Sequence, residues 1–182
     1  MEITHLAFEN VFVVQPRVFP DSRGEFVEAF VHHKLLTATG TDFEVAQVNL
    51  SVSKKGTIRG IHFAKNPPGQ AKYVQCATGS ILDVIVDLRL DSETFGKYVT
   101  VELTAEKRNA VHIPSGFGHA FQALTDNATV VYLCDQPFMP ANEFGINPLD
   151  ETVGIDWPLS DHIISEKDLE APAISAVATM LR

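Results

Sequence analysis

A cluster of basic side chains surrounds a proline turn between Arg59 and Tyr73. The segment reads RGIHFAKNPPGQAKY: it begins like a strand, breaks into a loop at its two prolines, and holds one arginine, one histidine and two lysines. So much positive charge at one point of an acidic chain suits a small anion, or a reaction that forms an anion. We therefore expect this segment to contribute to a site for an anionic small molecule.

Two histidines stand in glycine-marked surroundings, His62 after GTIRGI and His119 after PSGFG. These spacings resemble the two motifs of cupins, small β-barrels that supply metal ligands from their inner face. A metal-binding cupin would carry another histidine two residues after His62 and an acid soon afterwards. Ala64 occupies the first of these positions, and no acid lies between residues 65 and 73. Because zinc and iron usually take three or more protein ligands, we expect no catalytic metal and no cofactor.

The elements that must position these groups show an apolar period of two, which is typical of strands. Residues 81–89, ILDVIVDLR, place four apolar side chains on one face and Asp83 and Asp87, with two isoleucines, on the other. Three more strand-like runs follow, at residues 97–104, 109–114 and 128–134. Short strands at this spacing predict an all-β fold, an antiparallel sandwich or barrel, in one domain that spans the chain, 1–182.

Turns and a few short helices are expected between the strands. Ser-Gly-Phe-Gly at 115–118 predicts a turn. FVHHKLLTAT, residues 30–39, predicts a short helix that ends at Gly40, and Ser165 is expected to cap another helical turn.

Composition and charge limit the class of protein. The chain of 182 residues is 45% hydrophobic, enough for a sizeable core, and its net charge is -9, which argues against a nucleic-acid partner. The N-terminus lacks the pattern of a signal peptide, and no apolar stretch approaches the ~18 residues that a membrane span needs. We expect a cytoplasmic protein with no membrane partner, in which Cys76 and Cys134 are buried free thiols.

Nine segments in consistent order resemble the dTDP-4-dehydrorhamnose 3,5-epimerase family of nucleotide-sugar enzymes. They lie between residues 21 and 172 and read DSRGEFVE, QVNLSVSKKGTIRGIHF, QAKYV, DVIVDLR, SETFG, IPSGFGHAF, the strand tyrosine Tyr132, GIDWP and SEKDLEAP. The resemblance implies a cupin-type antiparallel β-barrel, or jelly roll, that works as a homodimer without a metal. The implied reaction inverts C3 and C5 beside the 4-keto group of a dTDP-linked 6-deoxyhexose, as in the biosynthesis of dTDP-L-rhamnose.

Inversion beside a ketone requires a base, an acid on the opposite face of the sugar, and a stabiliser for the enolate oxygen. His62 is the natural base, since its ordinary pKa lies near neutrality, and Asp168 would orient it. The resemblance implies that Tyr132 is the proton donor. Lys72 would face the developing oxyanion, with Arg59 close by.

The resemblance also implies a set of substrate-binding residues. Arg23 and Glu28, in DSRGEFVE, would reach the pocket of the partner subunit, where an arginine suits phosphate. Phe138 stands where the family often has a tyrosine near the thymine ring, so stacking is kept and a hydrogen bond is lost. The other implied binding residues are Gln47, Asn49, Arg59, His119, Glu143 and Lys167.

Each of these residues also has a structural interpretation. His62 and His119 could be packed histidines, Tyr132 could be ordinary core, and Asp168 could be a helix-end charge. Lys72 and Lys167 could be surface lysines.

Three functions follow from these alternatives. They are a metal-free epimerase, a metal-dependent cupin and a catalytically silent sugar-nucleotide binding module. The segments GHAF and NPLDET depart from the family pattern, and they leave open an enzyme that inverts only C3 or only C5.

Overall fold

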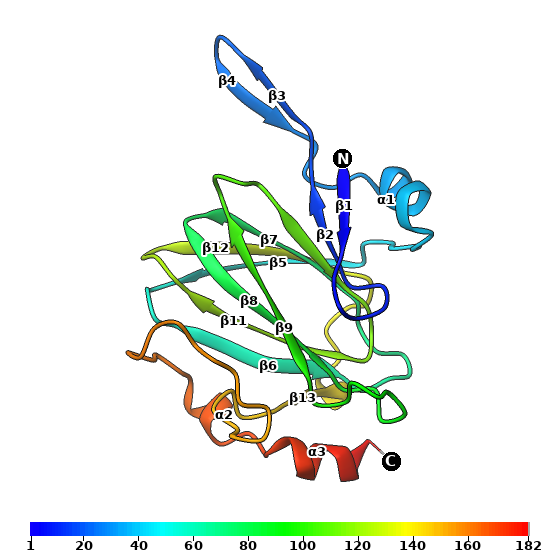
Figure 1. Cartoon of the computed structure of the whole chain (residues 1–182), viewed down its shortest axis with the longest axis vertical. Helices are drawn as coiled ribbons and strands as arrows, with labels where there is room; N and C mark the ends of the chain where they lie inside the picture. The colour runs from blue at the N-terminus through cyan, green and yellow to red at the C-terminus, as the bar shows by residue number, and fades with distance from the viewer. Residues whose placement is uncertain (182) are drawn as a thin grey trace.

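Two antiparallel sheets form the body of the computed structural model, which describes residues 1–181 (Figure 1). The six-stranded sheet consists, in spatial order, of β1 (Glu2–His5), β2 (Phe12–Gln15), β10 (Ala110–Ile113), β7 (Lys72–Thr78), β12 (Ala128–Cys134) and β5 (Gln47–Ser53). The five-stranded sheet consists, in spatial order, of β13 (Glu143–Gly145), β6 (Ile58–Ala64), β11 (Phe117–Ala123), β8 (Ser80–Asp87) and β9 (Tyr98–Thr104). Most neighbouring strands are distant in sequence, as in a jelly roll. The predicted all-β, cupin-type barrel is confirmed.

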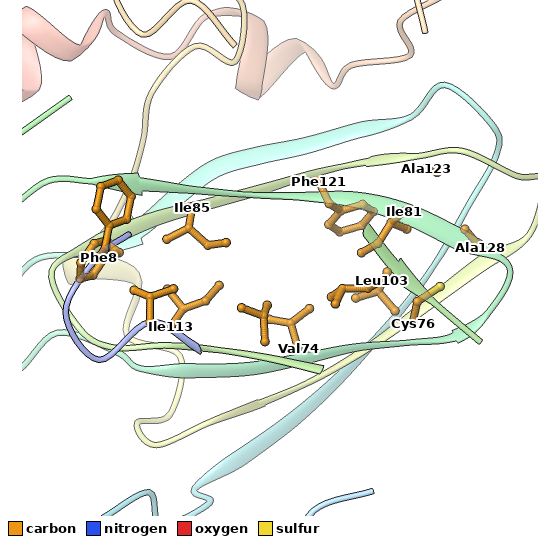
Figure 2. Packing of buried hydrophobic residues seen from close by; sticks show 14 residues of the cluster. Phe8, Val74, Cys76, Ile81, Ile85, Leu103, Ile113, Phe121, Ala123 and Ala128 are labelled. Carbon is orange, nitrogen blue, oxygen red and sulfur yellow. The ribbon is translucent and has the colours of Figure 1, made fainter. Parts of the chain in front are cut away.

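An apolar cluster fills the space between the two sheets (Figure 2). Figure 2 shows Ile81 and Ile85 of β8 on one wall and Val74 and Ile113 on the other, with their side chains in the space between. Because side chains alternate along a strand, Asp83 shares the inward row of the two isoleucines. That row therefore carries a carboxylate into the barrel.

The outer face of the five-stranded sheet is buried by the C-terminal segment. Val84 and Val86 of β8 pack in one cluster with Ile174 and Val177 of α3 (Ile174–Met180). Burying an aliphatic side chain of this size stabilises the fold by roughly 1.5–3 kcal/mol. This packing holds the C-terminal segment, which includes α2 (Glu166–Leu169), against the barrel.

Both predicted helix boundaries are confirmed. Helix α1 (His32–Thr39) ends at Gly40, whose φ of 72° lies in the left-handed region that favours glycine. Ser165 caps α2, because its Oγ accepts a hydrogen bond from the backbone N–H of Asp168 at 3.2 Å. A short 3-10 turn, Pro140–Asn142, precedes β13.

A hairpin of β3 (Val18–Asp21) and β4 (Gly24–Val27) stands away from the barrel (Figure 1). It forms a two-stranded sheet of its own, and Phe26 on it is 65% exposed. We call this hairpin the arm.

The predicted turn at 115–118 is wrong for its second half, since Phe117 and Gly118 begin β11. Phe117 packs in the apolar cluster, and a Cβ on Gly118 would overlap the side chain of Ile61. The glycine therefore marks close packing within a strand.

The cysteine expectation is confirmed, because Cys76 and Cys134 are buried and unpaired. Across residues 1–181, no helix has the length and apolar character needed to span a membrane.

Candidate active site

A β-bulge turns His62 into the barrel. His119 of β11 lies opposite His62, and Phe121 lies opposite Arg59, so three steps along β6 match two steps along β11. The extra residue falls at Gly60 and Ile61, where Gly60 has a φ of 104° and a Cβ would overlap the carbonyl oxygen of His119. Without the bulge, Arg59 and His62 would point to opposite faces of the sheet. With it, both lie on the inner row.

Asp168 holds the ring of His62 from the C-terminal segment. His62 Nε2 lies 2.7 Å from Asp168 Oδ1, and the backbone N–H of Gly60 donates to Oδ2 at 3.5 Å. Burial acts to raise the pKa of Asp168, but the hydrogen bond and charge of His62 outweigh it and leave the pKa below its ordinary value. An ionised carboxylate on one ring nitrogen leaves Nδ1 of the neutral imidazole free to accept a proton.

His62 lines a cavity of about 360 Å³ between the two sheets. On the facing sheet, Tyr132 of β12 lies between Asn49 of β5 and Val74 of β7 in register. Two residues further along the same row, Cys134 lies between Gln47 and Lys72. The complete lining is Gln47, Asn49, His62, Gln70, Lys72, Tyr132, Phe138, Glu143, Phe144 and Lys167.

Lys72 is a buried lysine in this cavity, with only 7% of its surface exposed. Burial lowers the pKa of its amine, and the nearby Cys134, Glu143 and Asp83 act in the opposite direction. Burial also raises the pKa of the Tyr132 phenol, which keeps it protonated near neutral pH. The wall opposite His62 thus carries a phenol that can donate a proton and a lysine amine.

Gln47 and Asn49 both take part in hydrogen bonds within the chain. Gln47 Oε1 accepts from the backbone N–H of Phe138 at 2.7 Å, and its Nε2 donates to Asn49 Oδ1 at 2.7 Å. Gln47 therefore fixes the loop that carries Phe138, whose side chain is 58% exposed at the edge of the cavity.

A second cavity of about 450 Å³ adjoins the first, and both are lined by His62 and Lys167. Arg59 and Asp168 line only the second. Ser53 and the carbonyl oxygen of Val52 accept hydrogen bonds from Arg59, at 3.1 and 3.4 Å. Lys72 and Arg59, expected to lie close together, are thus divided between two spaces that share His62 and Lys167.

His119 lies behind the cavity walls and lines neither space. It is buried, and its Nε2 lies 2.7 Å from Asp83 Oδ2, on the inward row of β8. Substrate binding by His119 stays a prediction, and little of its side chain is exposed. Asp83 was not among the predicted site residues, because both faces of residues 81–89 carry apolar side chains and the pattern did not show which face is turned inward.

Two predicted binding residues lie outside both cavities of this chain. Arg23 is at the tip of the arm, paired with Asp21 at 2.6 Å and 87% exposed. Glu28 follows the arm and pairs with Lys34 of α1. A single chain therefore does not bring either residue to His62.

Comparison with known proteins identifies the family of the chain. Residues 5–176 match the family model described as dTDP-4-dehydrorhamnose 3,5-epimerase. A dTDP-4-dehydrorhamnose 3,5-epimerase from Streptomyces griseus is 45% identical over 171 residues, which cover 93% of this chain and 85% of that protein. The chain belongs to the dTDP-4-dehydrorhamnose 3,5-epimerase family.

Two solved structures are closely similar to this family member. The rmlC epimerase of Mycobacterium tuberculosis superposes with a TM-score of 0.95 at 40% identity, covering 100% of this chain and 92% of that one. A 3′-monoepimerase from Streptomyces bikiniensis in complex with dTDP-quinovose has a TM-score of 0.91 at 43% identity, covering 96% and 89%. The chain is accordingly an epimerase by family, and the family includes enzymes named for one centre as well as two.

The epimerase site resembles the metal sites of other cupins only in its histidines. Within residues 1–181, no group of three or more His, Cys, Asp or Glu side chains is arranged to hold a metal ion. His62 and His119 lie opposite each other in register, but each pairs through Nε2 with its own aspartate.

Proposed function

We propose that this epimerase inverts C3 and C5 of dTDP-4-keto-6-deoxy-D-glucose, in the formation of a dTDP-L-rhamnose type of sugar. The observation that carries the proposal is the pairing of His62 with Asp168 at 2.7 Å on one wall of a cavity whose other wall holds Tyr132 and Lys72. A base and an acid on facing sheets can act on opposite faces of a sugar bound between them.

The steps follow from the chemistry of the four side chains. His62 removes the proton from the carbon beside the ketone, and Asp168 stabilises the imidazolium that forms. The electron pair moves to the C4 oxygen as an enolate, which the Lys72 ammonium stabilises. Tyr132 then gives its proton to the opposite face of the same carbon, and the electrons return from the oxygen.

The decisive experiment is incubation with dTDP-4-keto-6-deoxyglucose in deuterated water. Deuterium at both C3 and C5 of the product supports the proposal. Deuterium at neither centre, with folded protein, rejects the epimerase function in favour of a binding module.

A second candidate is inversion at one centre only. The resemblance to the monoepimerase from Streptomyces bikiniensis favours it, because that chain is as similar in sequence as the 3,5-epimerases are. Deuterium at one centre in the same experiment would select this candidate.

We also propose a homodimer in which each pocket borrows Arg23 and Glu28 from the other chain. The arm carries these residues outward, and Val48, Leu50 and Val52 form an exposed apolar stripe on β5, an edge strand. Such a stripe is typical of an interface. Strand β2 of the N-terminal segment has no free edge for a partner, because β1 and β10 flank it within the chain.

Mixing two inactive variants tests the shared pocket. Arg23→Ala chains combined with His62→Ala chains should regain partial activity, because some pockets then contain both intact residues. Verified subunit exchange without any return of activity would contradict the shared pocket.

The remaining proposals concern the metal and the compartment. We propose that turnover needs no metal, and stoichiometric zinc or iron in active protein would contradict this. A cytoplasmic location also remains a proposal, to be checked by fractionation of the cells that make the protein.

A further inference from the structure

Asp83 is a buried carboxylate for which the proposed reaction has no use. Its side chain has no exposed surface, and Oδ2 lies 2.7 Å from His119 Nε2. Its other oxygen, Oδ1, has no hydrogen-bond partner within residues 1–181. A buried carboxylate with a free oxygen is costly unless charges nearby compensate it.

The compensating charges come from two directions. His119 lies beside Asp83 on the neighbouring strand, whereas Lys72 belongs to the facing sheet. Burial leaves the pKa of Asp83 above its ordinary value, although both His119 and Lys72 act to lower it. Asp83 in turn opposes the loss of the proton from buried Lys72.

Lys72 and Asp83 attract each other without direct contact. No hydrogen bond or ion pair of 4 Å or less joins them in the described part of the chain. A direct ion pair would occupy the ammonium donors that an enolate needs. A carboxylate held at a distance supports the charge of Lys72 and leaves its N–H groups free for the substrate.

We propose that Asp83 is a positioning residue, whose carboxylate keeps Lys72 cationic and holds His119 in a single tautomer. Because a carboxylate only accepts, it fixes the proton of His119 on Nε2 and leaves Nδ1 as an acceptor. The inference rests on the proposed epimerisation, which gives the Lys72 cation its role.

Other titratable groups also surround Lys72 and belong to the same electrostatic environment. They are Tyr132 and Cys134 on β12, Asp83 on β8, His119 on β11, Glu143 on β13, His62 on β6 and Lys167 on α2. A test must therefore change the charge of Asp83 alone and preserve its shape.

Asp83→Asn is that change, and Asp87→Asn is its matched control. Asp87 lies on the same strand and the same row and is equally buried, but its partners are Arg89, Ser92 and Thr94. Removing the charge of Asp83 should lower the pKa of Lys72 further. The basic limb of the pH–rate profile should then move to lower pH, and the rate on that limb should fall by about tenfold for each unit by which the limb moves. In the control, Asp87→Asn, the basic limb of the pH–rate profile should stay at its wild-type pH.

Titration of Lys72 by NMR, with ¹³C-labelled lysine and no substrate, separates this inference from the proposed function. A Lys72 pKa that is equal in Asp83→Asn and wild type would overturn the inference, whatever the activity. A Lys72 pKa that is lowered in Asp83→Asn, while the basic limb of the pH–rate profile stays at its wild-type pH, would also overturn the inference. If the wild type fails to epimerise any sugar, the function is wrong, yet the titration still decides whether Asp83 supports the cation.

Two further measurements do not depend on the folding of Asp83→Asn. Lys72→Met should raise the pKa of Asp83, followed through its carboxyl ¹³C signal, because the coupling is mutual. In the wild type, ¹⁵N shifts of His119 should show the proton on Nε2. An unchanged Asp83 pKa, or a proton on Nδ1, would contradict the inference.

Discussion

Two histidine–carboxylate pairs lie on adjacent strands of one sheet and differ chiefly in their access to the cavity. His62 and His119 are opposite each other in register, and each places Nε2 at 2.7 Å from an aspartate oxygen. The side chain of His62 is 41% exposed and that of His119 is 9% exposed. The aspartate of the first pair follows the barrel in sequence, 106 residues away, whereas the second pair lies entirely in the barrel wall.

The difference shows that burial, rather than pairing, determines what such a pair can do. An exposed imidazole can exchange a proton with a substrate, and its aspartate stabilises the resulting charge. A buried imidazole with the same partner cannot reach a substrate carbon, so its pair acts through electrostatics. The following changes test this contrast in order of expected effect.

His62→Ala should have the largest effect, because it removes the only exposed base of the two pairs. We expect a loss of about 10⁴-fold or more in both solvent exchange and inversion. The measurement is deuterium incorporation into the dTDP-sugar by folded variant protein. Near-normal incorporation would show that the exposed pair is not the working one.

Tyr132→Phe should slow inversion by about 10²- to 10⁴-fold, since the enolate loses its opposite-face donor. His62 can still remove a proton and return deuterium to the same face. Exchange with retained configuration should therefore exceed inversion, and stereochemical analysis of the deuterated sugar measures both. A tyrosine that only packs would give inversion at an undiminished rate.

Asp168→Asn should be less severe than His62→Ala, because the imidazole remains and loses only its orienting charge. We expect a loss of about 10²-fold, near the lower limit of general-base effects. The dependence of kcat on pH in Asp168→Asn, compared with that in Asp83→Asn, should distinguish the roles of the two histidine–carboxylate pairs. Asp168→Asn should reduce the rate at every pH, whereas Asp83→Asn should chiefly move the basic limb. Identical profiles would remove the distinction between them.

His112 shows what burial does to a histidine that has no carboxylate partner. It stacks on Phe12, its Nδ1 lies 3.0 Å from the carbonyl oxygen of Asn10, and burial lowers its pKa to about 4. The imidazole of His112 therefore binds a proton near pH 6.5 in the unfolded chain, but only near pH 4 in the folded chain. Stability from His112 is therefore present above pH 6.5 and lost as the pH falls toward 4, by about 2 kcal/mol between pH 7 and pH 5.

His112→Phe should remove that part of the pH dependence and leave the rate of epimerisation unchanged. Urea unfolding of both proteins at pH 7 and pH 5 measures the difference. Equal losses of stability in wild type and variant would show that His112 does not respond to its burial in this way.

The strand pattern and the family motifs predicted most of the fold and most of the cavity. Period-two runs such as residues 81–89 identify a strand directly, and the motif residues His62, Lys72 and Tyr132 do line one cavity. The pattern could not reveal the role proposed for Asp83, because that role depends on Lys72, which belongs to the facing sheet. It also misjudged Phe117 and Gly118, where the glycine serves close packing within a strand instead of a turn.

Local sequence also could not predict how polar groups are used once the chain is folded. The amide of Gln47 lines the cavity, and it also holds the backbone of Phe138 and the side chain of Asn49, which the sequence did not indicate. Arg23 and Glu28 lie away from the cavity of their own chain, because the arm projects from the barrel. Their expected place in the pocket of a partner subunit stays a prediction. Such outcomes depend on register and topology, which long-range packing determines.

The bulge at Gly60 has a consequence for homologues and for redesign. Arg59 and His62 share the inner row only because the chain has one residue more than the neighbouring strand in this stretch. A variant that lost the bulge but kept the length of this segment, as a side chain at Gly60 would favour, would keep every catalytic residue by name and still turn the imidazole toward the outer layer. The glycine that permits the bulge is therefore as much a condition of catalysis as the imidazole that the bulge orients.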